Sequence, residues 1–328
     1  MALGICTPII AAVFAAFLGI TNPPPGLFVM IVLVVPLALI VAMVAARVFA
    51  QQAQMNLGGI MKVIIIGGVA GGASCAARLR RLDEKAEIIM VERGPYVSYA
   101  NCGLPYHVGG IIPEESELLV ATAETFRSQF AIDARTRCEA VAVDPDCKTL
   151  DLKNLETGEV VAEQYDKLVL SPGAPPIRPP LPGIDLPGIF SVRTVPDARE
   201  IRQWLKKGTP FLAGMDRYSG IQAVRPKTRA VVVGGGFIGL ETAENLAHRG
   251  FDVTVLEMGN QILGPLDREM ARVVEGYLER HGINVVLEDG AAEFRQSPTG
   301  LLEVYTKSGA IYPVSYTHLT LPTNRVAG

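Results

Sequence analysis

The sequence predicts an α/β protein with two βαβ units that follow an apolar N-terminal segment. Two glycine clusters predict the units, because each follows a short β-branched run and precedes a helix-like segment and a second strand. The charge distribution predicts the separate N-terminal segment, because the first charged side chain in the chain is Arg47. A length of 328 residues is enough for about two domains.

Residues 3–20 and 27–46 are almost wholly apolar, and each is close to the ~20 residues that cross a bilayer as a helix. The TNPPPG stretch between them is typical of a tight turn. We therefore predict a transmembrane hairpin and linker in residues 1–60, with membrane anchoring through residues 3–46. A buried helical hairpin is the alternative. The basic residues that begin at Arg47 favour a cytoplasmic location for the rest of the chain.

The first βαβ unit begins at Met61, where MKVIIIGG predicts a buried parallel strand that ends in glycines. Residues 73–82 have helical periodicity, and residues 87–92 (EIIMVE) form the expected second strand. Val69 breaks the usual G-x-G-x-x-G pattern, and its side chain should crowd a bound pyrophosphate unless the loop shifts. Glu92 ends the second strand, where a ligand for an adenosine ribose is expected.

The second βαβ unit carries a complete G-x-G-x-x-G pattern, formed by Gly234, Gly236 and Gly239 after the strand RAVVV. The first glycine permits a tight turn, the second lets the backbone approach a pyrophosphate, and the third lets the helix pack closely. Glu257 ends the next strand, where its carboxylate can accept both ribose hydroxyls of NADH and would repel a 2′-phosphate. The unit therefore predicts NADH binding, and a glycine turn that only connects strand and helix is the alternative.

A proline-rich stretch at residues 172–188 predicts the boundary between the two units. We expect one domain in residues 61–180 and a second, incomplete domain in residues 181–313. Residues 206–228 have no clear periodicity and predict a loop. Residues 314–328 continue no pattern, so we expect a non-native tail there that lacks the buried strand required after the preceding hairpin.

Composition excludes several function classes. A net charge of −3 argues against a nucleic-acid partner. The cysteines form no CxxC pair and no Cys/His cluster with zinc spacing, so we expect neither a disulfide scaffold nor a metal site, and a reducing compartment. The five are Cys6, Cys75, Cys102, Cys138 and Cys147.

Cys102 stands apart from the other cysteines, because it lies among turn-forming residues in VSYANCGLPYHVGG, residues 97–110. A thiolate is the nucleophile of disulfide exchange, and a helix that begins at Asn101 or Cys102 would lower the pKa of the thiol. The alternative is that Cys102 is a small buried hydrophobic residue, as free cysteines often are. The residues alone leave both interpretations open.

Four segments resemble the pyridine nucleotide–disulfide oxidoreductases, in that family's order: MKVIIIGGVAGGASCAARLRRLDEKAEIIMVERG, SYANCGLPY, DKLVLSPGA and AVVVGGGFIGLETAENL. The match covers residues 61–313 and is similar to the branch with one redox cysteine. That branch includes coenzyme A disulfide reductases, NADH-dependent polysulfide reductases, and NADH oxidases and peroxidases. The resemblance implies two Rossmann-like domains of the three-layer ββα type, which bind FAD and NAD(P), and homodimeric full-length relatives. The GGVAGG form with Val69 resembles this branch's own FAD loop.

The resemblance also implies roles for individual residues. Cys102 would be the redox centre beside the flavin, Phe237 would cover the nicotinamide pocket, and Glu241 would lie near that pocket. The FAD pyrophosphate would be held by Gly67, Gly68, Ala70, Gly71 and Gly72, the FAD ribose by Glu92, and the return strand that touches FAD would be Ser171, Pro172 and Gly173.

Position 107 is histidine, where relatives with two redox cysteines carry the second one. The resemblance therefore implies that Cys102 partners an external sulfur, and that NADH reduces coenzyme A disulfide or polysulfide through FAD. One alternative is an NADH oxidase or peroxidase, or a membrane-associated NADH dehydrogenase. Another is an inactive fragment, because the resemblance implies that the chain stops inside the NAD domain and lacks a second FAD segment and a dimerisation domain.

Overall fold

The computed structural model describes residues 60–207, 228–298, 300–314 and 316–319. The chain divides into two compact units, residues 1–61 and Lys62–Gly328, and every element below belongs to the second. The predicted hairpin in residues 3–46 and most of the predicted loop at 206–228 lie outside the described residues. Within the described part of the chain, no helix is both long and apolar enough to span a membrane.

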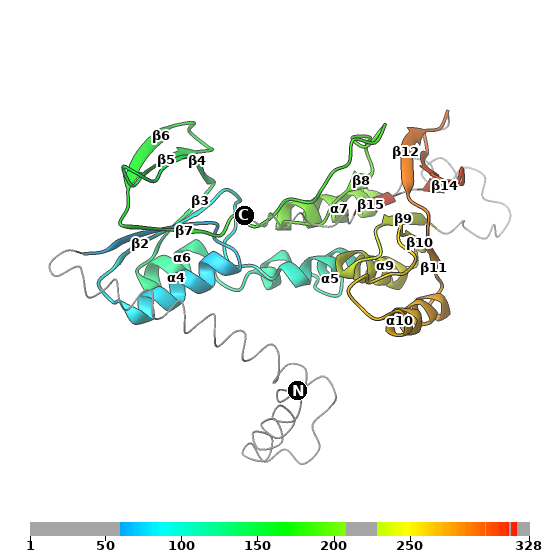
Figure 1. The fold of residues 1–328 in the computed structure, drawn as a ribbon, viewed down its shortest axis with the longest axis horizontal. Helices are drawn as coiled ribbons and strands as arrows, with labels where there is room; N and C mark the ends of the chain where they lie inside the picture. The colour runs from blue at the N-terminus through cyan, green and yellow to red at the C-terminus, as the bar shows by residue number, and fades with distance from the viewer. Residues whose placement is uncertain (1–59, 208–227, 299, 315, 320–328) are drawn as a thin grey trace, which may run out of the picture. The chain divides into compact units, whose positions relative to one another are not determined.

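The first βαβ unit forms a parallel sheet of four strands. Its strands are β1 (Lys62–Ile66), β2 (Glu87–Glu92), β3 (Asp133–Thr136) and β7 (Lys167–Leu170), in the order β3-β2-β1-β7. Helix α4 (Gly71–Leu82) connects β1 to β2 and contacts both strands (Figure 1). Val63, Ile64 and Ile65 are fully buried, as a strand covered on both faces requires.

The second βαβ unit forms a parallel sheet of five strands. These are β8 (Ile189–Phe190), β9 (Arg229–Val233), β10 (Asp252–Leu256), β11 (Ile283–Val286) and β15 (Tyr316–Leu319), in the order β11-β10-β9-β15-β8. Helix α9 (Phe237–His248) joins β9 to β10, and α10 (Arg268–Arg280) joins β10 to β11 (Figure 1). The two predicted βαβ units, and with them the mixed α/β class, are confirmed.

A three-stranded antiparallel sheet packs on each parallel sheet. One is β4 (Cys138–Asp144), β5 (Thr149–Asn154) and β6 (Val160–Gln164); the other is β12 (Ala291–Gln296), β13 (Leu302–Thr306) and β14 (Ile311–Val314). Alternation along β9 explains the layers, because successive side chains point to opposite faces. Val231 and Val233 pack with Phe294 of β12, whereas Ala230 and Val232 pack with the core that contains α9.

Strand β15 corrects the prediction that no strand follows the hairpin in residues 314–328. Thr317 pairs with Val231 of β9 on one side and with Ile189 of β8 on the other, both in parallel. The reason is that a ladder joins backbone groups, so a segment without an apolar pattern can fill a gap between two strands. The non-native origin of residues 314–328 stays a prediction, and residues 320–328 lie outside the described residues.

Short helices lie between β2 and β3 of the first sheet. The 3₁₀ turn η2 (Asn101–Gly103) leads into α5 (Leu104–Gly109), and η3 (Glu115–Leu118) and α6 (Ala123–Phe130) follow. Helix α5 packs against α9 and against α7 (Val195–Lys207). Gly109 permits the contact with α9, because a Cβ at this position would lie 2.2 Å from Oδ1 of Asn245.

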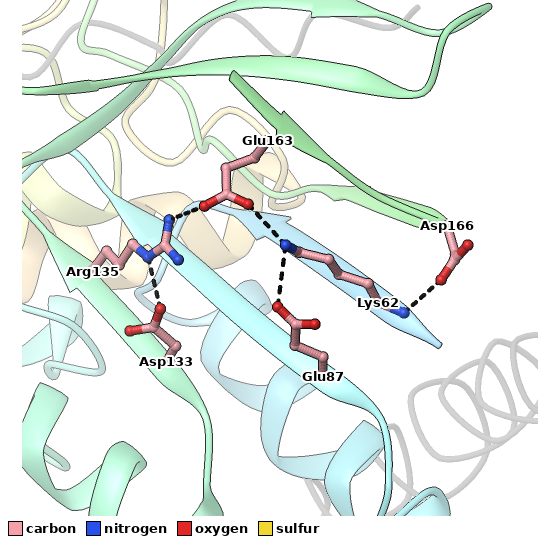
Figure 2. A network of polar contacts seen from close by, with 6 residues as sticks. All are labelled: Lys62, Glu87, Asp133, Arg135, Glu163 and Asp166. Carbon is pink, nitrogen blue, oxygen red and sulfur yellow. Dashed lines mark hydrogen bonds and ion pairs between the residues drawn. The ribbon is translucent and has the colours of Figure 1, made fainter. Parts of the chain in front are cut away.

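An ion network ties β6 to three strands of the first parallel sheet (Figure 2). Glu163 of β6 accepts from Nζ of Lys62 at 2.8 Å and from Nη1 of Arg135 at 2.8 Å. Lys62 also lies 3.1 Å from Glu87, and Arg135 donates to Asp133 at 2.7 Å. Burial opposes ionisation of Glu163, but the bonds from Lys62 and Arg135 outweigh it, so the pKa of this carboxyl lies below its ordinary value.

We expect Glu163→Gln to lower the free energy of unfolding by about 1–3 kcal/mol at pH 7, because two half-buried cations lose their shared acceptor. The pKa of Glu163 is depressed in the folded state, so its contribution is complete above the ordinary value of 4.5 and is lost as the pH falls through the lower folded value. Urea unfolding at pH 7 and near pH 3.5 measures both effects. Glu159→Gln removes the same charge from an exposed position and is the control. Equal losses for the two variants at pH 7 would contradict the prediction.

Candidate active site and dinucleotide-binding loops

The loop between β1 and α4 is closed by glycines that admit no side chain. Gly67 has a φ of +97°, and a Cβ there would lie 1.9 Å from the carbonyl oxygen of Ser171. A Cβ on Gly72 would lie 1.7 Å from the carbonyl oxygen of Gly67. Ser171 follows β7 and donates its amide to Ile66 at 2.7 Å, so the predicted return strand does meet this loop.

Val69 lies on the packed side of the loop rather than on its exposed side. Its side chain packs against the hydrophobic core that also holds Leu104 and Val108, while Ala70 and Gly71 are exposed. No side chain caps the start of α4, which has no acidic residue in its first turn. Free amides at a helix N-terminus are donors for a pyrophosphate, so the residues present fit the FAD phosphates.

The second loop repeats this design at the start of α9. Gly234 has a φ of +112°, and Gly236 is the residue before the helix, which again has no side-chain cap. A Cβ on Gly236 would meet nothing within 4 Å, so the backbone here borders open space rather than protein. Gly239 is buried within α9, in agreement with its predicted packing role.

The two acidic residues occupy equivalent positions. Glu92 accepts from the amides of Gly68 at 2.8 Å and Gly94 at 2.7 Å. Glu257 accepts from the amides of Gly235 and Gly259, both at 2.7 Å. Each carboxylate oxygen has a further lone pair, so both residues can also accept ribose hydroxyls. Sequence reasoning missed Gly235, whose role depends on a contact across 22 positions.

A cavity of about 620 Å³ opens at the second loop. Gly234, Gly235, Gly236 and Glu257 line it, together with the turn from Met258 to Gln261. Lys307, which follows β13, also lines the cavity and was not predicted. Its size and its position outside the carboxyl ends of parallel strands match a nucleotide site.

Cys102 is exposed in the 3₁₀ turn η2, two residues before α5. The alternative of a buried structural cysteine is therefore wrong for this residue. It fits Cys138 instead, which is buried, and burial raises the pKa of that thiol. Beside Cys102, the buried Oδ1 of Asn101 has no hydrogen-bond partner within the described residues, so an acceptor next to the thiol is left for a ligand.

Tyr106 of α5 lies within electrostatic range of both α9 and Cys102. The charge of Glu241 on α9 is the largest influence that raises the pKa of Tyr106, followed by burial and by the charges of Glu244 and Cys102. Burial, with a contribution from Glu244, also raises the pKa of Glu241. Phe237, the first residue of α9, is 61% exposed and free to cover a bound ring. The predicted residues Cys102 and Glu241 therefore lie within electrostatic range of one tyrosine.

His107 has a structural role. It is buried, its Nδ1 lies 2.8 Å from the carbonyl oxygen of Ile112, and burial lowers the pKa of its imidazole. Arg202 of α7 donates to the carbonyl oxygen of His107 at 3.1 Å, and Arg249 donates to that of Val108 at 2.8 Å. Two arginines from distant positions therefore fix the end of α5. Contacts between residues so far apart in the sequence cannot be predicted from a local sequence pattern.

Comparison with known proteins identifies the family. The family model of the pyridine nucleotide-disulphide oxidoreductases matches residues 61–319. The chain belongs to this family. Pyridine nucleotide-disulphide oxidoreductases use FAD and NADH, in agreement with the two glycine loops.

The chain matches each of several relatives over about half of that relative's own length. A coenzyme A disulfide reductase of Staphylococcus haemolyticus is 36% identical over 67% of this chain and 46% of its own, and an NADH oxidase of Methanocaldococcus jannaschii is 36% identical over 69% and 47%. The crystal structure of reduced Bacillus anthracis CoADR-RHD is 42% identical, with a TM-score of 0.73 over 83% of this chain and 46% of that one. An NAD-dependent persulfide reductase from A. fulgidus is 33% identical, with a TM-score of 0.72 over 81% and 46%.

Proposed function

We propose that the protein is an FAD-dependent oxidoreductase that passes electrons from NADH to a disulfide or polysulfide at Cys102. The observation that carries the proposal is the exposed thiol of Cys102 on a segment that contacts both halves of the structure. In this segment the amide of Ser98 donates to the carbonyl oxygen of Gly68 at 2.9 Å, and α5 packs against α9. The relatives named coenzyme A disulfide reductase and persulfide reductase support a sulfur acceptor.

Different residues of the chain would bind the cofactors and react with the sulfur acceptor. When bound, FAD and the nicotinamide supply hydride transfer. The Gly67–Gly72 loop and Glu92 would hold FAD, and the Gly234–Gly239 loop and Glu257 would hold NADH. Cys102, as a thiolate, would attack one sulfur of the acceptor and release the other as a thiol or sulfide. Position 107, where relatives with two redox cysteines carry the second one, is histidine. The bond that forms at Cys102 would therefore be to an external sulfur.

Parallel acceptor assays test the proposal. The chain spans about half the length of the relatives it matches, so the assay uses the chain extended by a family-like C-terminal region. Coenzyme A disulfide and polysulfide should be reduced faster than dioxygen. The NADH oxidase relative favours oxidation by dioxygen as the second candidate function, and dioxygen as the fastest acceptor would select it. A preparation without bound flavin would favour an inactive fragment instead.

We also propose that residues 3–46 anchor the catalytic portion to the cytoplasmic side of a membrane. Their apolar composition and the absence of charged side chains before Arg47 support this proposal. The expressed chain should then sediment with membranes and resist alkaline extraction, whereas a chain that starts at Met61 should stay in the supernatant. If both chains stay in the supernatant, the segment is not an anchor.

A further inference from the structure

The cavity at the second loop contains one anion and one cation among its described lining residues. Glu257 is the anion and Lys307 is the cation; the other lining residues are apolar, glycine or amide side chains. Both oxygens of Glu257 are held by glycine amides, with Oε2 on Gly235 and Oε1 on Gly259. The position of the negative charge is therefore fixed on both sides.

The fold places Lys307 beside Glu257 through a chain of hydrogen bonds. The amide of Asp289 donates to the carbonyl oxygen of Glu257 at 3.1 Å, and the amide of Lys307 donates to that of Gly290 at 2.9 Å. The carboxylate of Asp289, which is 7% exposed, accepts from the hydroxyl of Ser308 at 2.6 Å and from its amide at 3.1 Å. The β13–β14 turn that carries Lys307 is thus attached to the segment that pairs with Glu257.

The ammonium group of Lys307 has no carboxylate partner in the part of the chain that the structure describes. Its one polar contact there is the sulfur of Met258, at 3.6 Å from Nζ. Met258 directly follows Glu257 and is 59% exposed at the cavity. An unpaired cation therefore borders the cavity on the Met258–Gly259 side of Glu257, whereas the glycine loop lies on the Gly235 side.

This arrangement separates the two places where a dinucleotide carries phosphate. The pyrophosphate belongs at the glycine loop and the start of α9, and the ribose hydroxyls belong at Glu257. A phosphate on the ribose 2′ oxygen would extend away from the loop, toward Met258. We propose that Lys307 is a specificity-determining residue that binds this 2′-phosphate, so that the cavity accepts a 2′-phosphorylated dinucleotide despite Glu257. The inference rests on the proposed dinucleotide site.

Two opposite charges then set the preference for the cofactor. Glu257 favours the free 2′-hydroxyl, because it accepts a hydrogen bond from it and repels a 2′-phosphate. Lys307 opposes this effect, because its ammonium attracts the phosphate. Removal of either charge should change affinity for the 2′-phosphorylated ligand in opposite directions, while the ligand without that phosphate should respond to Glu257 alone.

Binding of 2′,5′-ADP and 5′-AMP to the full 328-residue chain in mild detergent tests the inference, because these probes differ only by the 2′-phosphate. Titration calorimetry should show that Lys307→Gln weakens 2′,5′-ADP by about tenfold and changes 5′-AMP by less than about twofold. Lys307→Arg should retain the affinity for 2′,5′-ADP, and Glu257→Gln should increase it. Lys85→Gln, an exposed lysine of the first domain, is the matched control and should change neither probe.

Other outcomes would overturn either the role of Lys307 alone or the dinucleotide site as well. An equal loss for both probes in Lys307→Gln would show that Lys307 binds the 5′-phosphate and would overturn the inference. An unchanged affinity for 2′,5′-ADP in that variant would overturn it as well. In both cases the binding of 5′-AMP by the unmodified chain would still support the dinucleotide site. Failure of both probes to bind the unmodified chain would overturn the proposed site, and the inference with it.

Discussion

Replacement of Cys102 by serine is expected to lower NADH-dependent reduction of coenzyme A disulfide or polysulfide by ~10³-fold or more. Serine keeps the shape of the turn but forms no bond to an acceptor sulfur, and its hydroxyl is a far weaker nucleophile than a thiolate near neutral pH. Flavin binding should be unchanged, because the loop proposed to hold FAD lies between β1 and α4. The rates are measured in the chain extended by a family-like C-terminal region, with each acceptor in turn.

Cys147→Ser provides a matched control for this variant. Cys147 is also exposed, but it lies in the turn after β4 rather than on the segment that precedes α5. Its replacement should leave all rates within about twofold, which is the usual result for a surface change away from a site. If Cys102→Ser keeps the sulfur rates and dioxygen is the fastest acceptor, the sulfur function is wrong and the oxidase function is supported.

Local sequence patterns predicted the central strands well. The apolar runs at β1, β2 and β9 placed these strands to within about one residue, because a strand buried on both faces needs a continuous β-branched run. Helix starts were less accurate. Helix α4 begins at Gly71, two residues before the predicted start, because no capping side chain marks it.

Long-range contacts limited the prediction of the site. Glu92 and Glu257 were found because each ends a strand, but their glycine partners depend on how each loop folds back. The side chain of Val69 packs against a core assembled from both βαβ units, which no local pattern describes. Strand β15 was missed because its pairing with β8 and β9 is set by the open position between them.

The first glycine loop should be the least tolerant part of the fold. We expect Gly72→Ala to lower the free energy of unfolding by about 3–5 kcal/mol and to abolish flavin binding. The added Cβ would lie 1.7 Å from the carbonyl oxygen of Gly67 and 3.1 Å from Cγ2 of Ile65. Neither group can move freely, because the amide of Gly67 donates a hydrogen bond to the carbonyl oxygen of Val91 at 2.8 Å and Ile65 is fully buried in β1.

The same substitution at Gly276 distinguishes this steric effect from a general effect of alanine. Gly276 lies in the middle of α10, and its added Cβ would meet only the end of the Arg280 side chain, at 3.5 Å. Alanine there should raise the free energy of unfolding by about 0.5–1 kcal/mol, because glycine is the poorer helix former. Urea unfolding of both variants, with flavin absorbance as the second measurement, gives opposite signs if the contact at Gly67 decides the result. If Gly72→Ala unfolds like the unmodified chain and keeps its flavin, the loop can shift by more than an ångström, and the closed geometry is not required for binding.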